Sequence, residues 1–304
     1  MSNSKIISIT GDLGSGKSTV SNLLCQQLNY DYIYTGKIQR EIALKYNMTT
    51  LELNKYSETH PEIDDEIDSV LKSLNTATNL IADSRLAWFF IPKSFKVFLK
   101  TNLIVSANRI SNDNERKNEK YSSKEEAVNK IIARKTSENK RYMDLYGANC
   151  AKLNNYNLII DTSFISPEKV ADIIIAEYDL WVDSNECAKS FISPANLYPT
   201  KTIKDVENEH INSINSEKKA NDYFEFPVIA VNFNSFDYII DGHKKTSLAV
   251  KNNIDLISVV YKDENDWFSD EMTCKDKILS SINKSLFYEW EKYNLFNYLI
   301  YPQL

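Results

Sequence analysis

One glycine-rich segment close to the N-terminus constrains this chain more than any other feature. Residues 11–18 read GDLGSGKS and fit the pattern GxxxxGK[ST]. They follow the apolar run KIISIT at residues 5–10, which is typical of a buried parallel strand, and they lead into helical periodicity at residues 17–28. Glycines in such a turn let several backbone N–H groups point inward, and the helix adds its positive N-terminal end. The segment therefore predicts a P-loop that binds a nucleoside triphosphate.

The side chains of this P-loop have expected tasks. Lys17 is expected to reach the β- and γ-phosphates, and the Ser18 hydroxyl is expected to bind Mg²⁺. The expected nucleotide-binding residues are Gly11, Gly14, Ser15, Gly16, Lys17, Ser18 and Thr19. ATP and Mg²⁺ are thus the expected cofactors. The motif alone does not separate a kinase from a GTPase or a motor, so the acceptor side of the site has to decide the activity.

Short apolar strands alternate with helices over the first 180 residues. The strand patterns lie at residues 31–34, 79–83, 95–100 and 157–161. The helical patterns lie at residues 36–46, 62–74, 103–109 and 123–145. A capping-box pattern at residues 49–52 and Ser166 followed by Pro167 mark two further helix starts. This alternation predicts an α/β domain in which helices cover both faces of a parallel sheet.

The pattern changes near residue 180, and residues 183–190 read as a junction. Beyond it we expect strands at residues 226–231, 238–240 and 256–261, a helix at residues 246–252, and a helical, aromatic-rich tail at about residues 270–298. The expected domains are therefore residues 1–180 and a smaller α+β domain at residues 190–304. The polar stretch at residues 111–123 has two interpretations, a solvated loop or a mobile lid.

Charge and composition exclude several classes of protein. The 304 residues carry a formal net charge of −6, so no overall basic field would recruit nucleic acid, and we expect no nucleic-acid partner. No stretch approaches the roughly 18 apolar residues of a membrane span, and the N-terminus has no secretory pattern. The four cysteines, Cys25, Cys150, Cys187 and Cys274, form no CxxC pair, so we expect reduced thiols. The expected location is cytoplasmic, and the oligomeric state stays open.

Basic residues downstream of the P-loop are the candidates for the acceptor side. A small kinase must neutralise the acceptor phosphate and the transferring group. The candidates are Arg40, Arg85, Arg109, Arg116, Arg134 and Arg141. Arg134 and Arg141 are seven residues apart, so they share one face of the expected helix. For any one of these arginines, a surface salt bridge is the alternative interpretation.

Six segments, in their order along the chain, resemble the cytidylate kinases, particularly the short archaeal type. They read GDLGSGKST, YTGKIQREIA, HPEIDDEID, DSRLAWF, SENKRYMDLYG and LIIDTSFISPEKV. The resemblance covers residues 5 to about 176 and implies a nucleoside monophosphate, CMP or dCMP, beside the P-loop. Two departures, at Asp12-Leu13 and Asp83-Ser84, remove no phosphate ligand but leave the identity of the acceptor open.

The same resemblance implies roles for particular residues. The substrate-binding residues would be Thr35, Gly36, Arg40, Asp64, Arg85 and Asp161. The catalytic residues would be Lys17, Arg109, Arg134 and Arg141, with the arginines closing on the phosphates from the lid side. Asp161 would hold the sugar or orient an arginine. No general base is needed, because the acceptor phosphate is already an anion and positioning does most of the work.

The C-terminal part resembles a second family. Residues 192–200 (ISPANLYPT) and 226–261, within residues 190–262, are similar to the ParB/sulfiredoxin-like superfamily, which includes free-serine kinases. The phosphate-binding motif that this implies consists of Asp241, Gly242, His243, Lys244, Lys245 and Thr246. Lys245 stands where the family usually has an arginine, and lysine cannot form the bidentate phosphate contact. A charged surface turn is the alternative, and sulfiredoxin chemistry is excluded because this motif lacks cysteine.

Three functions stay open at this point. The first is ATP-dependent transfer to a nucleoside monophosphate, with a second phosphate-binding or kinase-like domain at the C-terminus. The second is a kinase of a free amino acid such as serine, or of a modified nucleotide. The third is a nucleotide-sensing regulatory protein with little turnover. The complete P-loop and the downstream arginines favour the first.

Overall fold

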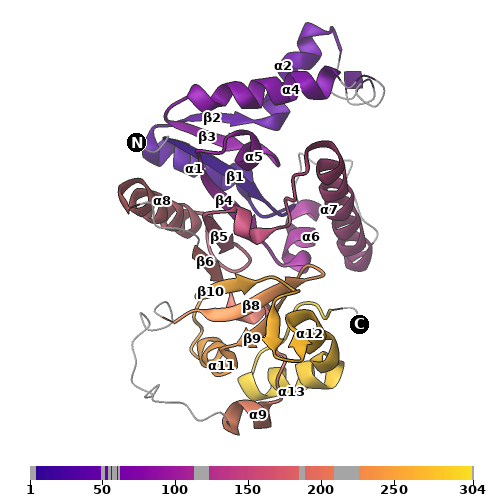
Figure 1. Cartoon of the computed structure of the whole chain (residues 1–304). Helices are drawn as coiled ribbons and strands as arrows, with labels where there is room; N and C mark the ends of the chain where they lie inside the picture. The colour runs from indigo at the N-terminus through magenta and orange to yellow at the C-terminus, as the bar shows by residue number, and fades with distance from the viewer. Residues whose placement is uncertain are drawn as a thin grey trace. The chain divides into compact units, whose positions relative to one another are not determined.

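The computed structural model (Figure 1) describes residues 5–48, 52–53, 56, 60, 62–112, 123–184, 189–208 and 226–302. The chain splits into two compact units. The first comprises Met1–Lys100, Arg134–Leu158 and Ile165–Ala188, and the second comprises Thr101–Ala133, Ile159–Phe164 and Lys189–Leu304. Two segments from the first 180 residues thus pack with the C-terminal part, and the predicted division at residues 180–190 stays a prediction.

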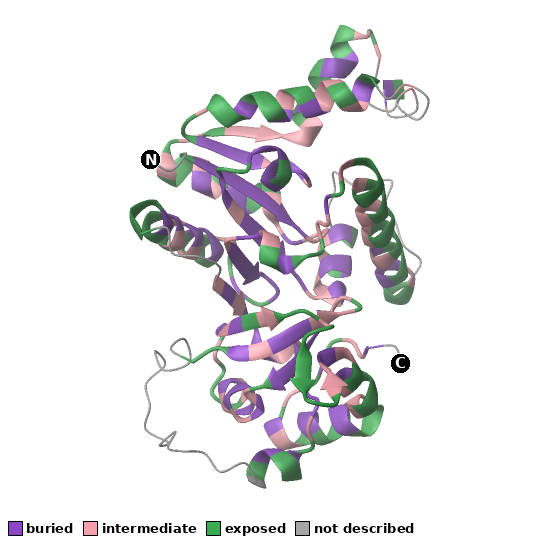
Figure 2. Ribbon diagram, in the orientation of Figure 1, coloured by how far each residue is buried: buried purple, intermediate pink, exposed green. Residues whose placement is uncertain are grey.

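Four parallel strands form the sheet of the first unit, in the order β2-β3-β1-β4. Their bounds are β1 Ile6–Gly11, β2 Asp31–Tyr34, β3 Leu80–Asp83 and β4 Phe95–Lys100. Ile7 of β1 lies opposite Ile81 of β3 and Phe95 of β4, which fixes the register on both sides. Figure 2 shows β1 buried along its length, as expected of a strand covered on both faces. The predicted parallel α/β sheet is confirmed.

Helices cover this sheet on both faces. In the first unit they are α1 (Lys17–Leu28), α2 (Thr35–Lys45), α4 (Glu62–Ser73), α5 (Ala87–Phe90) and α8 (Pro167–Ser184), with the 3₁₀ turns η1 (Leu74–Thr76) and η3 (Leu153–Asn155). Helices α1 and α8 pack together on one face, and α5 packs against β1 on the other (Figure 1). Helix α8 starts as the sequence predicts, because the Ser166 hydroxyl accepts a hydrogen bond from the N–H of Lys169 at 3.2 Å.

Two elements carry residues of both units. Helix α7 spans Lys124–Tyr146, and its second half, from Arg134 onward, belongs to the first unit. Strand β5 spans Leu158–Asp161 and is buried along its length. Both match segments that the sequence pattern predicts.

The second unit is a mixed α+β structure with the strand order β6-β10-β8-β9-β7. The strands are β6 (Lys189–Ile192), β7 (Leu197–Tyr198), β8 (Val228–Phe233), β9 (Phe236–Asp241) and β10 (Ile257–Lys262). Strands β8 and β9 form a hairpin whose turn residues, Asn234 and Ser235, both have positive φ. The pairs β8–β10 and β7–β9 are parallel, so this part of the sheet is not a simple meander.

The helices of this unit close its core. They are α6 (Leu103–Ser111), α9 (Ile203–Asn208), α11 (His243–Lys251), α12 (Cys274–Ser281) and α13 (Lys284–Asn294), together with the 3₁₀ turn η4 (Pro194–Asn196). Tyr198 and Tyr298 stack at 4.5 Å over the buried Phe287, and the Tyr298 hydroxyl donates to the Leu197 carbonyl. These contacts fix the C-terminal tail against β7.

Two details of the C-terminal part differ from the sequence-based expectation. Helix α11 begins at His243 rather than at residue 246, because Gly242 serves as its N-cap. The tail is helical as predicted, but a short hairpin of β11 (Trp267–Ser269) and β12 (Met272–Thr273) precedes it. Thr273 then begins α12 with a complete capping box to Asp276.

Candidate functional site

The P-loop turn depends on glycine at two positions, for different reasons. A Cβ on Gly11 would lie 2.2 Å from the backbone oxygen of Leu99 on β4, so no side chain fits there. Gly16 has φ 83, in the left-handed region, and is the N-cap of α1. The sequence therefore forms the tight strand-to-helix turn that a phosphate cradle needs.

Lys17 lies folded over this turn. Its Nζ donates to the carbonyl oxygens of Gly11 at 3.2 Å and Asp12 at 2.9 Å. Ser18 and Thr19 are exposed in the first turn of α1. The ammonium and the hydroxyls thus border the cradle, where phosphate oxygens would meet them.

Asp83 is a functional candidate that the sequence reasoning missed. It ends β3, and its Oδ2 accepts a hydrogen bond from the Tyr32 hydroxyl at 3.2 Å. Burial raises the pKa of Asp83, while the nearby Lys17 ammonium, the Tyr32 hydrogen bond and Arg85 act against that rise. The available signal was an acidic residue that ends the apolar run LIAD, on the strand next to β1.

Ser18 and Asp83 together fit a Mg²⁺ ion bound with the nucleotide. In P-loop proteins the ion is held by the loop hydroxyl and an aspartate on a neighbouring strand, together with phosphate oxygens. Tyr32 connects the two groups, because hydrogen bonds to both Ser18 and Asp83 influence its pKa. Within the described ranges, no group of three or more histidine, cysteine or acidic side chains could hold a metal by itself. The donor set is therefore one that a nucleotide would complete.

A cavity of about 260 Å³ lies in the same unit, between α2, α4, the β3–α5 turn and the second half of α7. It is lined by Thr35, Gln39, Leu53, Ile63, Asp64, Ile67, Asp68, Leu71, Ser84, Arg85, Leu86, Arg134, Glu138, Arg141, Tyr142 and Tyr146. Its size is close to the lower end of the roughly 300–1,000 Å³ of ordinary ligand pockets. We call it the acceptor pocket.

The acceptor pocket brings together five of the residues predicted for the acceptor side: Thr35, Asp64, Arg85, Arg134 and Arg141. Gly36 and Arg40 do not line it. Arg40 is exposed, donates to the Tyr34 hydroxyl and lies 5.2 Å from the centre of that ring.

Ion pairs join the charged side chains that line the pocket. Glu138 accepts from Arg85 at 3.1 Å and, through its other oxygen, from Arg134 at 2.8 Å. Arg85 also donates to the carbonyl of Gly11, which connects the pocket to the P-loop. Arg141 pairs with Asp64 at 2.7 Å. The arginines that line the pocket are therefore held in two groups, Arg85 and Arg134 on Glu138 and Arg141 on Asp64.

One acid in the lining, Asp68, is buried. Asp68 is only 5% exposed, and it lies among Ile67, Leu71 and Tyr146 of the lining. Burial raises the pKa of Asp68, and a hydrogen bond from Tyr146 partly offsets the rise. The sequence reasoning missed this residue because it is one of several acids in the run EIDDEID.

Two predicted site residues, Arg109 and Asp161, belong to the second unit. Arg109 donates to the backbone oxygen of Thr162 at 2.7 Å and to its hydroxyl at 3.2 Å. Burial lowers the pKa of Arg109, and Asp161 opposes that effect. The catalytic role of Arg109 stays a prediction.

Asp161 is 2% exposed and is surrounded by donors. It accepts from the N–H and hydroxyl of Ser163, from the N–H of Ser193 at 3.3 Å and from the Asn196 amide at 2.6 Å. Its predicted contact with a sugar or an arginine also stays a prediction.

The predicted C-terminal phosphate motif is partly packed into the fold. The Nε2 of His243 accepts from the N–H of Thr200 at 3.1 Å, and burial, reinforced by Lys201 and Lys277, lowers the pKa of His243 to about 3. Lys245 is buried, donates to the carbonyl of Phe226, and has its pKa lowered by burial to about 8.

The other members of that motif lie nearer the surface or within the turn. Asp241 is exposed and Lys244 is half-buried, whereas the Thr246 hydroxyl donates to the Gly242 carbonyl at 3.1 Å. The motif's phosphate-binding role stays a prediction.

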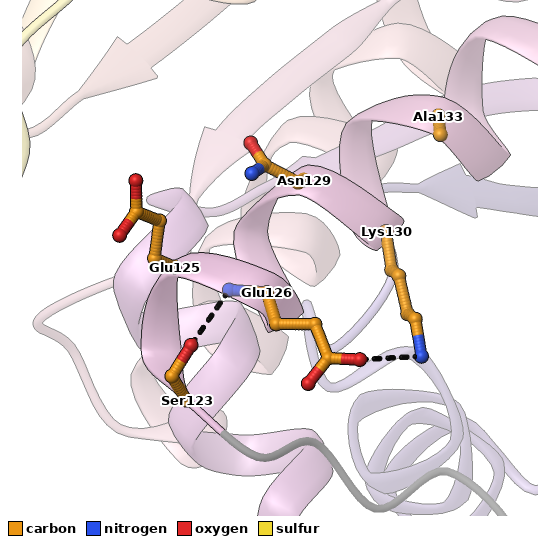
Figure 3. A pocket seen from close by; sticks show the side chains of 6 residues that line it. All are labelled: Ser123, Glu125, Glu126, Asn129, Lys130 and Ala133. Carbon is orange, nitrogen blue, oxygen red and sulfur yellow. Dashed lines mark hydrogen bonds and ion pairs between the residues drawn. The ribbon is translucent and has the colours of Figure 1, made fainter.

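A second cavity, of about 480 Å³, follows the first half of α7 (Figure 3). Its lining consists of Ser123, Glu125, Glu126, Asn129, Lys130 and Ala133. The Ser123 hydroxyl accepts from the N–H of Glu126 at 3.1 Å, and Lys130 pairs with Glu126 at 2.8 Å. These contacts stabilise the helix itself, and we assign no chemistry to this surface.

Several predictions concern residues outside the described ranges: Arg116, Cys187, the start of the capping box at residues 49–51 and most of the polar stretch at residues 111–123. Cys25, Cys150 and Cys274 are free thiols, as expected. In the described part of the chain, no helix is long and apolar enough to span a membrane.

The N-terminal part of the chain is similar to known proteins. The Cytidylate kinase-like family matches residues 6–164. The chain is 36% identical over 178 residues to a cytidylate kinase of Thermoplasma volcanium, covering 57% of this chain and 90% of that protein. It is 37% identical over 175 residues to a cytidylate kinase of Pyrococcus abyssi, covering 57% and 93%. A solved shikimate kinase from Bacteroides thetaiotaomicron superposes with a TM-score of 0.44 and 16% identity, over 57% of this chain and 98% of that one. The chain therefore belongs to the cytidylate kinase-like family, and its P-loop unit is that of a nucleoside monophosphate kinase.

Proposed function

We propose that this chain transfers the γ-phosphoryl group of ATP to CMP or dCMP. The observation that carries the proposal is the lining of the acceptor pocket, which holds three arginines and the buried acid Asp68. A nucleotide carries matching groups, because its phosphate suits arginines and its base can donate to an acid. Arg85 contacts Gly11 of the P-loop, so an acceptor phosphate bound by Arg85 would lie next to the donor.

The donor phosphates would be held by the loop N–H groups and Lys17. Mg²⁺, held by Ser18 with Asp83, would supply charge neutralisation between the β- and γ-phosphates. A phosphate oxygen of the acceptor forms the new bond to the γ-phosphorus. The bond between the γ-phosphorus and the oxygen that bridges the β- and γ-phosphates breaks, and ADP leaves. Arg134 would stabilise the charge on the transferring group, and no side chain has to remove a proton.

The base preference follows from Asp68 in the lining of the pocket. The exocyclic amino group of cytosine is a donor that a carboxylate accepts. Uracil presents a carbonyl oxygen at that position, which would face the same acid without a donor. Asp68, held by Tyr146, therefore favours CMP or dCMP over UMP.

The test is a transfer assay on the purified chain with ATP and Mg²⁺. The acceptors are CMP, dCMP, UMP, AMP, GMP and free serine, and Lys17→Ala is the control. Rapid conversion of CMP or dCMP that depends on Lys17 is the expected result. Asp68→Asn should narrow the preference for CMP over UMP without abolishing transfer.

Other outcomes point elsewhere. Phosphorylation of serine that survives Lys17→Ala would place a second kinase in the C-terminal unit. No conversion of any acceptor would favour a modified nucleotide, and stable CTP binding without turnover would favour a regulatory protein.

A second candidate function concerns the C-terminal unit. We propose that the turn before α11 binds a phosphate group, supported by the left-handed Gly242 at a helix N-terminus and by the half-buried Lys244 beside it. His243 and Lys245 would support the fold rather than touch the ligand. Calorimetric titration with CTP in a Lys17→Ala background tests this proposal, and Lys244→Ala should remove the residual binding.

A further inference from the structure

Each arginine that lines the acceptor pocket is paired with a carboxylate. Arg141 pairs with Asp64, whereas Arg85 and Arg134 both pair with Glu138. The two oxygens of Glu138 lie 3.1 Å and 2.8 Å from the Nε atoms of the two guanidinium groups. One carboxylate therefore holds together two arginines that come from different elements.

We propose that Glu138 occupies the position of the acceptor phosphate while the pocket is empty and is displaced when the acceptor binds. The inference rests on the proposed function, because it takes Arg85 and Arg134 to be phosphate ligands. A carboxylate bridging two guanidinium groups makes the same charge-assisted contacts that two phosphate oxygens would make.

Charge favours the displacement. Arg85, Arg134 and Glu138 together carry a single positive charge, and a phosphate monoester at neutral pH brings close to two negative charges. If Glu138 stayed, the group would become net negative in a pocket where its side chain is only 27% exposed. If Glu138 leaves, two positive charges face two negative ones.

The displacement costs little because of where Glu138 lies. Its contact with Arg134 joins residues four apart on α7, and such pairs contribute little to the stability of a helix. The contact with Arg85 is the one that links α7 to the β3–α5 turn. The acceptor phosphate would contact Arg85 and Arg134 in place of Glu138. An anion would therefore bridge the two arginines whether the pocket is empty or occupied.

The opposite role is that Glu138 is a permanent support that orients Arg85 and Arg134. The two roles predict opposite signs for Glu138→Gln, which keeps the shape and removes the charge. A displaced carboxylate competes with phosphate, so its removal tightens binding. A permanent support helps phosphate binding, so its removal weakens binding.

The experiment is calorimetric titration of the full chain with inorganic phosphate. The P-loop is first saturated with a non-hydrolysable ATP analogue and Mg²⁺, so that phosphate reports on the acceptor side. Glu138→Gln should tighten phosphate binding by about three- to fivefold. It should tighten CMP by a similar factor and leave cytidine, which has no phosphate, unchanged.

Glu126→Gln is the matched control. Glu126 lies on the same helix and also pairs with a residue four positions away, Lys130, but it does not line the acceptor pocket. This variant should bind phosphate like the wild type. Unchanged or weaker phosphate binding by Glu138→Gln overturns the proposal.

A second variant covers the case in which Glu138→Gln does not fold. Glu138→Asp keeps the charge, but its shorter side chain cannot bridge both arginines, so about twofold tighter phosphate binding is expected; no gain overturns the proposal. The proposed function fails separately. If CMP is not phosphorylated but Glu138→Gln still tightens phosphate, only the acceptor is wrong. If CMP is phosphorylated and phosphate affinity does not change, only the inference is wrong.

Discussion

Gly16 and Gly242 cap their helices in almost the same backbone conformation, with φ 83 and ψ 19 at Gly16 and φ 93 and ψ 22 at Gly242. Each follows a strand and each precedes a lysine-containing helix. The surroundings differ. A Cβ on Gly16 would meet nothing within 4 Å, whereas a Cβ on Gly242 would lie 3.2 Å from the Cα of Val228. The same turn is thus open in one unit and packed in the other.

The side chains that follow the two glycines show the same contrast. Ser18 and Thr19 are exposed after Gly16, whereas His243 and Lys245 are buried after Gly242. A left-handed glycine before a helix therefore does not identify a phosphate site by itself. What distinguishes the P-loop is the open space beside Gly16 and the exposed hydroxyls of Ser18 and Thr19 that follow it.

The largest expected effect is that of Lys17, which we expect to act in catalysis, whereas Lys245 supports the fold. Lys17→Ala should reduce the rate of phosphoryl transfer about 10²- to 10³-fold, because the charge that meets the transferring group is lost. The free energy of unfolding should change little, since the Lys17 ammonium donates to the carbonyls of Gly11 and Asp12 in its own loop. Steady-state kinetics with urea unfolding as the control measures both. A comparable loss of stability would mean that Lys17, too, is a structural residue.

Alanine at the two glycines should cost different amounts of stability. Gly16→Ala should destabilise the chain by about 1–2 kcal/mol, from the left-handed φ alone. Gly242→Ala should cost about 2–4 kcal/mol, because its Cβ would also press against Val228. Chemical denaturation of both variants gives the difference. An equal loss of unfolding free energy in the two variants would show that β8 moves to make room for the new Cβ. The turn at Gly242 would then not be closely packed.

The pH dependence of stability should depend on His243. Its folded pKa of about 3 lies below the unfolded value of 6.5, so the unfolded chain binds the proton first as the pH falls. Stability is therefore present above pH 6.5 and is lost below it, by up to about 1.4 kcal/mol per pH unit. In His243→Gln the side-chain oxygen can still accept from Thr200. In this variant the free energy of unfolding should depend less on pH between pH 7 and 5. An unchanged slope would rule out a buried neutral histidine.

The smallest effect concerns Lys245. Its pKa of about 8 lies below its unfolded value of 10.5, so the folded state disfavours the charge. The contribution of Lys245 to the free energy of unfolding is full above pH 10.5. It is lost as the pH falls from 10.5 to about 8. Lys245→Met should therefore raise the free energy of unfolding at pH 7 by about 1 kcal/mol. The gain should shrink between pH 8 and 9.5, which thermal unfolding at several pH values would detect.

Much of the P-loop unit could be predicted because its signals are local. The apolar run before the glycines, the helical periodicity after them and the short strands at residues 31–34 and 95–100 match the observed bounds. Each pattern reflects burial on one face or on both faces of a single element. Such burial can be predicted from the spacing of apolar residues within one segment of the sequence.

The acceptor side was predictable only in part. The arginines were found because phosphate chemistry requires them, but Glu138 and Asp68 were not, since each is one acid among several on a charged helix. What makes them special is the partner that another element brings to them, Arg85 for Glu138 and Tyr146 for Asp68. Pairings of that kind depend on tertiary packing, which no local pattern encodes.

The hydrogen bonds around Asp161 show what the C-terminal half contributes to residues inside the family match. The family match ends at residue 164, and a chain cut after α8 would look like a complete catalytic module. Two donors to the buried Asp161 carboxylate, the Ser193 N–H and the Asn196 amide, would be missing from that shortened chain. In that shortened chain the carboxylate would keep the N–H and hydroxyl of Ser163 as donors and lose the other two. Residues beyond the family match therefore help to hold an aspartate that lies inside it.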